Sequence, residues 1–149
     1  LPPRTEAYSE LELADAVAEA LVVIELCDSR LADWRSVEPL WKLADFQMNA
    51  ALVLGTGVRD WRNIDFSAQP VELWVDAVRT ISIRGSHPFE NPFRLLPWAA
   101  AHVARRAGGL RAGDVVTTGS WTGMEFVPPG AEVTARFAGI GEACVRLTV

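Results

Sequence analysis

The feature that most constrains the fold is an apolar run, residues 22–27, that carries one carboxylate and ends in a charged turn. Its β-branched composition, bounded by Asp28-Ser29-Arg30, is typical of a strand buried in a sheet. Glu25 interrupts this run. Because side chains alternate between the two faces of a strand, Glu25 shares its face with Val23 and Cys27, which are both apolar.

A carboxylate among apolar neighbours requires a partner, since leaving it ionised and unpaired costs on the order of several kcal/mol. The partner of Glu25 is then a metal ion, a basic side chain or a proton. The alternative is that Glu25 points to the wet face of a half-exposed strand. Either way, Glu25 is a candidate functional residue.

Composition restricts the classes of protein. The chain has 149 residues, enough for one domain, and a net charge of -5, which argues against a nucleic-acid partner. No apolar run approaches the roughly 20 residues of a membrane span, and no signal peptide is evident. Cys27 and Cys144 lie in apolar runs without zinc-type spacing, so we expect buried free thiols in a cytoplasmic, soluble protein.

Helix signals occur early in the chain. Ser9 and Glu12 form a capping box ahead of a helix over about 10–20, whose apolar face is expected to hold Leu11, Ala14, Val17, Ala18 and Leu21. Residues 40–49 have helical propensity with polar side chains among apolar ones, as in a half-exposed helix. Residues 50–54 then predict a short buried strand that closes in a turn at 55–57.

A hairpin follows in the middle of the chain. Residues 71–76 and 79–84 both alternate apolar and polar side chains, and Ala77-Val78 separates them as a turn. The chain leaves this hairpin through Gly85-Ser86-His87-Pro88. A histidine in such a loop is more often a plain surface residue than a ligand or a base, so we expect His87 on the surface.

The second half begins with a helix and ends in strands. Asn91-Pro92 caps a helix over 92–107, which Gly108-Gly109 stops. Strand-like runs follow at 115–118, 132–138 and 143–149. The chain is therefore expected to be α+β, mainly β, with two or three helices packed against the strands.

The turn at residues 117–123 is a second candidate site. It leaves the expected strand through two glycines and several hydroxyl side chains, with Thr118-Gly119-Ser120 at its centre. Exposed backbone N–H groups and hydroxyls are what a carboxylate or an oxyanion requires. Turns of this composition are common, and the alternative is that Ser120 only caps its own turn.

Several short runs, taken in order, resemble a known family. The chain resembles the C-terminal half of the fumarylacetoacetate hydrolase superfamily, in its branch of 2-hydroxypenta-2,4-dienoate (2-keto-4-pentenoate) hydratases and 4-oxalocrotonate decarboxylases. The runs are Ile24-Glu25-Leu26-Cys27-Asp28-Ser29-Arg30 with Asp33-Trp34, Leu43-Ala44-Asp45, Ser86-His87-Pro88, Leu96-Pro97-Trp98-Ala99-Ala100, Leu110-Arg111-Ala112-Gly113-Asp114-Val115-Val116, Thr118-Gly119-Ser120 and Gly139-Ile140-Gly141.

The resemblance implies a mixed β-roll wound around a divalent cation that three carboxylates hold, of which Glu25 matches the third. Mg2+ or Mn2+ suits such oxygen ligands, and it would bind a 2-oxo or 2-hydroxydienoic acid and act as a Lewis acid. Thr118, Gly119 and Ser120 match the turn that closes on the substrate. Asp45 matches a substrate-binding position, although Phe46 replaces the Asn that commonly follows it.

The chain departs from this family at its start. In the family, the other two metal carboxylates form a Glu-x-Glu pair upstream of the helix that precedes the position of Glu25. The family's catalytic Lys and general base lie further upstream. Glu10-Leu11-Glu12 belongs to the capping box and is not accepted as that pair. Since the first residue is Leu1 rather than Met, a missing N-terminal segment or a companion chain is expected to supply these groups.

Two classes of function remain open. The first is a metal-dependent hydratase of 2-hydroxy-2,4-dienoates, with 2-oxo acid decarboxylase or acylpyruvate hydrolase as alternatives in the same superfamily. The second is a non-catalytic assembly subunit. Six tryptophans and the apolar hairpin at 71–84 also predict a homo-oligomer.

Overall fold

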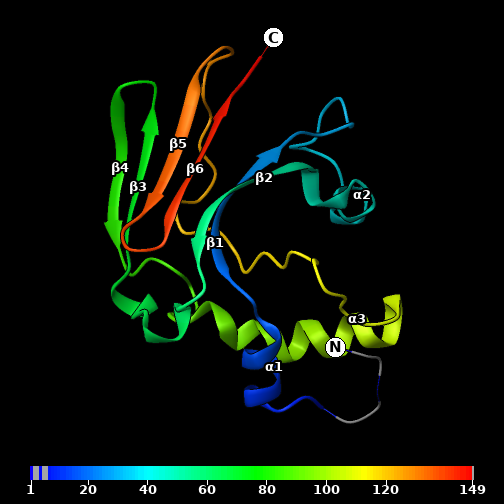
Figure 1. Cartoon of the computed structure of the whole chain (residues 1–149). Coiled ribbons are helices and arrows are strands. Elements are labelled where there is room, and N and C mark those ends of the chain that lie inside the picture. The colour runs from blue at the N-terminus through cyan, green and yellow to red at the C-terminus, as the bar shows by residue number, and fades with distance from the viewer. Residues whose placement is uncertain (2–3, 5–6, 149) are drawn as a thin grey trace.

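The computed structural model describes residues 1, 4 and 7–148, and within them it contains two antiparallel sheets and three α-helices (Figure 1). One sheet pairs β1 (Ala20–Cys27) with β2 (Asn49–Val58). The other has the order β4-β3-β5-β6, formed by β3 (Pro70–Val75), β4 (Val78–Arg84), β5 (Glu132–Phe137) and β6 (Gly141–Arg146). The helices are α1 (Glu10–Ala16), α2 (Pro39–Ala44) and α3 (Leu96–Ala107). The expected class, α+β and mainly β with two or three helices, is confirmed.

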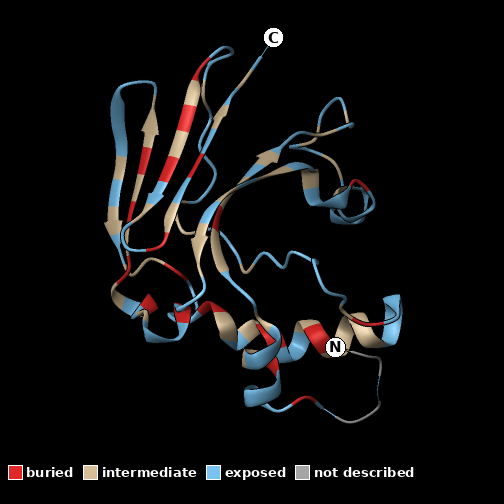
Figure 2. Ribbon diagram, viewed as in Figure 1, coloured by how far each residue is buried: buried red, intermediate tan, exposed pale blue. Residues whose placement is uncertain are grey.

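The four-stranded sheet carries the main core on one face. Leu73, Val133 and Ala135 are buried there, and Val22 of β1 and Phe66 pack against them (Figure 2). Most side chains on the opposite face are polar or charged, such as Glu72, Arg136 and Glu142, since the same strands alternate. The sheet is therefore half-buried, as the alternating sequence pattern predicts.

The predicted turn at Gly55-Thr56-Gly57 is wrong, because β2 runs through these residues to Val58. β2 lies against β6 at this point, and the Glu142 N–H donates to Thr56 Oγ1 at 2.9 Å. A Cβ atom on Gly55 would overlap the Glu142 carbonyl oxygen, and one on Gly57 would overlap the Ala20 carbonyl oxygen. The two glycines thus allow close backbone approach rather than a turn.

The helices α1 and α3 form a second, smaller core in which Leu13, Leu96 and Ala100 are buried. The capping box is confirmed, since Ser9 Oγ accepts from the Glu12 N–H and Glu12 Oε2 accepts from the Ser9 N–H. The helix ends at Ala16 rather than at residue 20, and its expected apolar face is only partly correct, since Val17 packs against this core. Leu13 faces the core, whereas Leu11 is 71% exposed.

Other boundaries differ from the sequence pattern. The helix expected over 40–49 stops at Ala44, and the strand expected over 115–118 is absent, because residues 109–131 contain neither helix nor strand. The hairpin is confirmed, but its turn lies at Asp76-Ala77, with Asp76 at a φ of 53°. The helix after Asn91 is confirmed as a 3-10 turn, Pro92–Leu95, that continues into α3. Among the described residues, no helix has the length and apolar content to span a bilayer.

Candidate functional site

A β-bulge shapes the surroundings of Glu25. Glu25 lies opposite Leu52 and Leu26 opposite Ala51, but Cys27 lies opposite Asn49, so that Ala50 is an extra residue in β2. Since one added residue reverses the alternation of faces, the bulge turns Asn49 to the face that bears Glu25. The Asn49 amide nitrogen donates to Glu25 Oε1 at 2.7 Å.

Glu25 itself is exposed, so the expectation that it faces an apolar surrounding is wrong for this chain. Alternation places Glu25 away from the face of Val22 and Ile24, which pack in the main core. The alternative, a carboxylate on the wet face of a half-exposed strand, matches the structure. Within the described part of the chain, the second oxygen of Glu25 accepts no hydrogen bond.

Asp45 follows α2 and is buried, with its carboxylate directed at the turn after β1. Its Oδ2 accepts from Ser29 Oγ at 2.9 Å and from the Arg30 N–H at 3.1 Å, and its Oδ1 pairs with the Arg30 guanidinium at 3.1 Å. Burial raises the pKa of Asp45, but the hydrogen bonds from Ser29 and Arg30 outweigh it and hold the pKa below its ordinary value. Asp45 therefore organises this turn.

The turn that links Asp45 to Asn49 has an unusual backbone. Phe46, Gln47 and Met48 have φ values of 53°, 55° and 68°, in the left-handed region that L residues rarely adopt. Such a conformation persists only where neighbouring contacts impose it. The Arg30 guanidinium supplies one contact by donating to the Asn49 carbonyl at 2.8 Å. We call residues 25–30 and 45–49 together the bulged end.

A cavity of about 220 Å³ opens at the bulged end. It is lined by Cys27, Asp28, Ser29, Trp34, Met48, Met124 and Phe126. No sequence pattern indicated this cavity, because Met124 and Phe126 come from the segment after α3 and reach the bulged end only in the folded chain.

Cys27 and Cys144 are free, as expected, but both are exposed rather than buried. Each cysteine lies on the solvent-facing side of its strand. The sequence did not predict this exposure, because the residues around each cysteine are mostly apolar. Partial desolvation raises the pKa of the Cys27 thiol, and the charge of Glu25 raises it further.

His87 contacts the turn at Thr118-Gly119-Ser120 through a hydrogen bond. The prediction that His87 lies on the surface is wrong. His87 is only 3% exposed. The Phe89 N–H donates to His87 Nδ1 at 3.2 Å, so Nε2 carries the proton and donates to the Thr118 carbonyl at 2.9 Å. Both ring nitrogens are thus engaged by the backbone, and the neutral ring holds the turn in place.

Ser120 is exposed, and its hydroxyl donates to the Gly123 carbonyl at 2.9 Å. This is the contact of a residue that caps its own turn. The hydroxyl must give up this bond before it donates to a ligand. Gly119 has a φ of 115°, which only glycine adopts readily, and it lies against the His87 ring.

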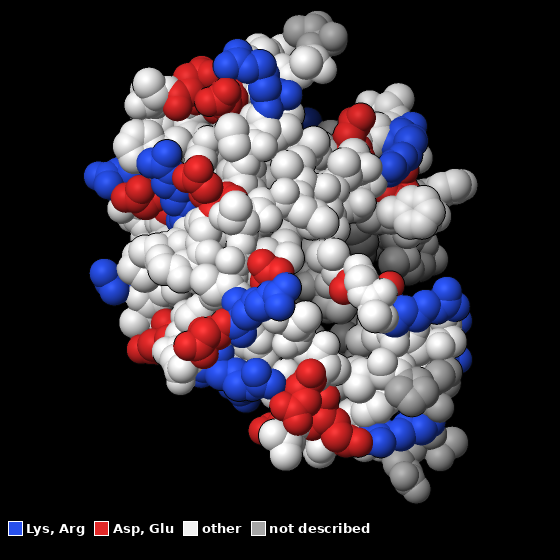
Figure 3. Space-filling view, viewed as in Figure 1, with Lys and Arg blue, Asp and Glu red and all other residues white. Residues whose placement is uncertain are grey.

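The remaining acidic residues do not complete a metal site. In the part of the chain that the structure describes, no group of three His, Cys, Asp or Glu side chains lies close enough to hold a metal ion. Glu12 pairs with Arg4, and hydrogen bonds from Arg4 and from the backbone and side chain of Ser9 lower the pKa of Glu12 to about 2. Acidic and basic side chains are interspersed over the face shown in Figure 3.

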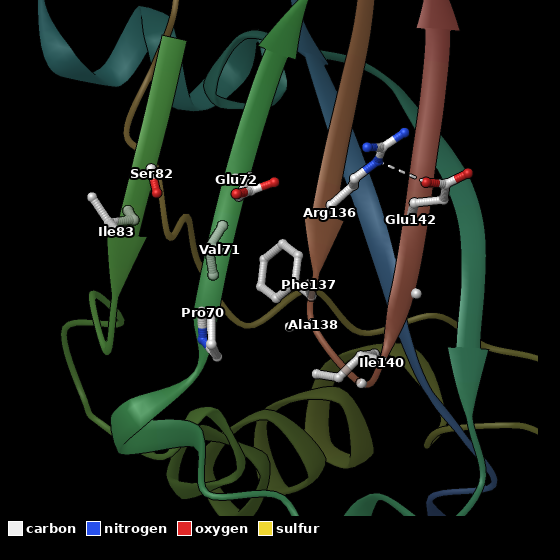
Figure 4. A pocket seen from close by; sticks show the side chains of 12 residues that line it. Pro70, Val71, Glu72, Ser82, Ile83, Arg136, Phe137, Ala138, Ile140 and Glu142 are labelled. Atoms are coloured by element: carbon white, nitrogen blue, oxygen red, sulfur yellow. Dashed lines mark hydrogen bonds and ion pairs between the residues drawn. The ribbon is translucent and has the colours of Figure 1, made fainter. Parts of the chain in front are cut away.

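A larger cavity, of about 550 Å³, lies elsewhere, at the end of the four-stranded sheet (Figure 4). Pro70, Gly139 and Ile140 contribute to its lining, and Arg136 pairs with Glu142 across its rim at 2.9 Å. None of the candidate site residues lines it, so its size alone does not make it the functional site.

The sequence and the fold are similar to those of known proteins. The profile of the fumarylacetoacetate (FAA) hydrolase C-terminal family matches residues 3–148, and the chain belongs to this family. It is 34% identical over 130 residues to a 2-keto-4-pentenoate hydratase of Paraburkholderia phymatum, covering 87% of this chain and 49% of that protein. It is 32% identical over 143 residues to one of Burkholderia vietnamiensis, covering 96% and 54%. The chain thus spans about half the length of these curated relatives.

Solved structures show the same fold at lower identity. Two structures of a 4-oxalocrotonate decarboxylase from Pseudomonas putida G7 superpose with TM-scores of 0.75 and 0.78, at 21% identity. Both cover 93% of this chain, and they cover 51% and 52% of the decarboxylase. One is complexed with calcium and acetate, the other with magnesium and adipate. The expected C-terminal FAA hydrolase fold is confirmed.

Proposed function

We propose that the intact protein is a divalent-metal-dependent hydratase of 2-hydroxy-2,4-dienoates, of the 2-keto-4-pentenoate type. The observation that carries this proposal is the state of Glu25, an exposed strand carboxylate whose Oε1 accepts from Asn49 while Oε2 accepts no hydrogen bond from the described residues. A carboxylate fixed in this way is a prepared ligand for a hard cation. The names of the relatives supply the reaction.

The metal is Mg2+ or Mn2+, with Glu25 as its ligand from this chain. The bound calcium and magnesium of the decarboxylase structures support a divalent ion. One carboxylate does not hold such an ion alone, so the other ligands and the general base come from an N-terminal segment or a companion chain. When bound, the ion would act as a Lewis acid on the 2-oxo or 2-hydroxydienoic acid.

Other residues of the chain serve the same reaction. Asn49 orients the Glu25 carboxylate, and Asp45 fixes the turn from which Asn49 emerges. The turn at Thr118, Gly119 and Ser120 provides polar groups for the substrate carboxylate. Asp45 acts on the substrate only indirectly, by holding this turn, because its two carboxylate oxygens already accept hydrogen bonds from Ser29 and Arg30.

A second candidate is 2-oxo acid decarboxylation, which the fold of 4-oxalocrotonate decarboxylase favours. Acylpyruvate hydrolysis would use the same Lewis-acid chemistry of a divalent ion and would differ in groups outside this chain. A non-catalytic assembly subunit is the alternative of another class. The intact protein is expected to be cytoplasmic and homo-oligomeric, which sedimentation at micromolar concentration tests.

The experiment compares Glu25→Gln with the intact wild-type protein. Calorimetric titration with Mg2+ measures the metal affinity, and the loss of dienoate absorbance measures hydration. Glu25→Gln is expected to lower Mg2+ affinity by about tenfold or more. Glu142→Gln is the matched control, because Glu142 is also an exposed strand carboxylate with one donor, Arg136. Unchanged Mg2+ binding in Glu25→Gln would contradict the metal role.

A further inference from the structure

The cavity at the bulged end has a mixed lining. Its polar residues are Asp28, whose Oδ1 accepts from the Ser29 N–H at 2.8 Å, and Ser29, whose Oγ donates to Asp45. The remaining lining is formed by thioether and aromatic side chains, those of Trp34, Met48 and Met124 with Phe126. Flexible thioethers fit apolar groups of varied shape.

The cavity lies next to Glu25. Cys27 lines it and stands two residues along the strand face of Glu25, about 7 Å away at the rise of a β-strand. Met48, which also lines the cavity, directly precedes Asn49, whose amide donates to Glu25. The Asp28 N–H donates to the Met48 carbonyl at 2.9 Å, which fixes this wall against the end of β1.

The segment that closes the cavity is long and irregular. Residues 109–131 contain neither helix nor strand, and unstructured connections longer than about 12–15 residues are usually functional or disordered. Here the segment is anchored: Ser86 Oγ donates to the Trp121 carbonyl at 2.7 Å. Further along, the Arg35 guanidinium lies 4.3 Å from the Trp34 ring centroid and 5.5 Å from that of Phe126.

Met124 and Phe126 remain 47% and 71% exposed in this anchored segment. The contacts of Arg35 keep Phe126 beside Trp34, so the apolar rim is held open to solvent next to a candidate metal ligand. An apolar rim in this position suits a ligand whose polar end lies at Glu25 and whose hydrocarbon end points away from it.

We propose that this cavity binds the hydrocarbon end of the 2-oxo or 2-hydroxydienoic acid, and that Met48 and Met124 set the chain length that is accepted. The inference rests on the proposed function, because it requires the polar end of the acid to lie at Glu25. At about 220 Å³ the cavity is smaller than the roughly 300–1,000 Å³ of drug-sized sites, which suits an end of few carbons.

The test measures binding of three acids to the intact protein with saturating Mg2+, by calorimetry or by the fluorescence of Trp34 and the other tryptophans. Oxalate has the polar end alone, 2-oxopentanoate adds a short chain, and 2-oxooctanoate adds a long one. Met124→Ala is expected to weaken 2-oxopentanoate about tenfold, equivalent to 1.4 kcal/mol, and to leave oxalate unchanged. Met124→Trp, which fills the cavity, is expected to reject 2-oxooctanoate.

Val116→Ala is the matched control, because Val116 is an exposed apolar residue of the same segment that does not line the cavity. It should leave all three affinities as in wild type. If oxalate binds and both Met124 variants keep the wild-type preference for chain length, the cavity does not hold the chain and the inference fails alone. If wild type binds none of the acids, the proposed function fails together with the inference.

Discussion

In the four-stranded sheet the backbone ladder and a continuous apolar face supply most of the stability, whereas at the bulged end side-chain hydrogen bonds hold an irregular backbone. Val71, Leu73 and Ala135 are buried in regular register on the sheet. At the bulged end, by contrast, Arg30 and Asp45 hold a turn of three residues with positive φ.

Residues of the four-stranded sheet stabilise the fold, whereas residues of the bulged end are positioned by it. Polar networks cost stability when they are incomplete, and they persist where they orient specific groups. Here the network ends on Glu25, an exposed carboxylate. Substitutions in the two regions should therefore differ in kind: the sheet should lose stability, and the bulged end should lose ligand affinity.

The largest expected effect comes from Leu73→Ala in the sheet. Leu73 is 6% exposed in the main core, and truncation of a buried leucine costs about 2–5 kcal/mol of unfolding free energy. Denaturant unfolding of the intact protein measures the loss. Leu54→Ala is the control, because Leu54 is 53% exposed and should cost less than about 0.5 kcal/mol. A loss for Leu73→Ala as small as the control's would show that the apolar face of the sheet does not determine its stability.

The second prediction concerns Asn49→Ala at the bulged end. Removal of the amide frees the Glu25 carboxylate to rotate, and loss of such an orienting partner weakens metal binding about 10–100-fold. Calorimetric titration with Mg2+ measures the change. Asn63→Ala removes a similar bond, from Asn63 to Asp60 at 3.0 Å, away from the site. Equal Mg2+ affinities in the two variants would show that Asn49 has no orienting role.

The third prediction concerns His87, which couples the loop after the hairpin to the candidate substrate turn. His87→Ala leaves the Thr118 carbonyl and the Phe89 N–H without their partner, at a cost of about 1–3 kcal/mol. Faster amide exchange at residues 118–121 should accompany the loss. His102→Ala, which removes only a ring stacked on Trp98, serves as the control. Unchanged exchange in His87→Ala would show that other contacts hold the turn.

The sequence predicted the regular region better than the site. Alternation along residues 71–76 and 79–84 predicted the hairpin, and the Ser9 and Asn91 caps located two helix starts, because these signals are local. The pattern failed at Gly55 and Gly57, where a contact with distant Glu142 and Ala20 decides the conformation. Local composition does not separate a glycine in a turn from one in a close crossing of strands.

At the site, the sequence identified Glu25 but predicted the wrong environment for it. The bulge at Ala50 and the bond from Asn49 depend on the register between β1 and β2, which no single run encodes. The position of His87 was missed for the same reason, since its partners lie at Phe89 and at Thr118, 31 residues away. A histidine followed by Pro88 gave no local signal of burial.

The fourth prediction compares carboxyl groups of the two regions under acid. Hydrogen bonds from Arg79 and Trp74 lower the pKa of Glu72 on the sheet, and those of Ser29 and Arg30 lower the pKa of Asp45 despite its burial.

A depressed folded-state pKa means that each group stabilises the fold above its ordinary pKa, of 4.5 for Glu72 and 3.8 for Asp45, and that this stabilisation is lost as pH falls through the lower folded value. Glu72→Gln and Asp45→Asn should each flatten the loss of stability below about pH 4.5. Only Asp45→Asn should also weaken Mg2+ binding at neutral pH. Weaker Mg2+ binding in Glu72→Gln as well would show that Mg2+ affinity does not depend specifically on the bulged end.

The smallest expected effect is that of Ser120→Ala. Because the Ser120 hydroxyl donates to the Gly123 carbonyl, a bond to the substrate carboxylate replaces an existing one, and the gain is only their difference. With about 1.5–3 kcal/mol for a charge-assisted bond and about 0.5–1.5 kcal/mol for a neutral one, the midpoints differ by about 1.2 kcal/mol, so turnover of 2-hydroxypenta-2,4-dienoate should fall by roughly tenfold. Unfolding free energy should fall by about 0.5–1 kcal/mol.

Ser67→Ala is the matched control for this variant, because Ser67 is another exposed turn serine and donates to Asp65 at 2.6 Å. It should lose a similar amount of stability and keep wild-type kinetics. Steady-state hydration rates and melting temperatures of both variants in the intact protein separate the two roles. If Ser120→Ala also keeps wild-type kinetics with a lowered melting temperature, Ser120 caps its turn and the backbone N–H groups of the turn are left as the donors to the substrate.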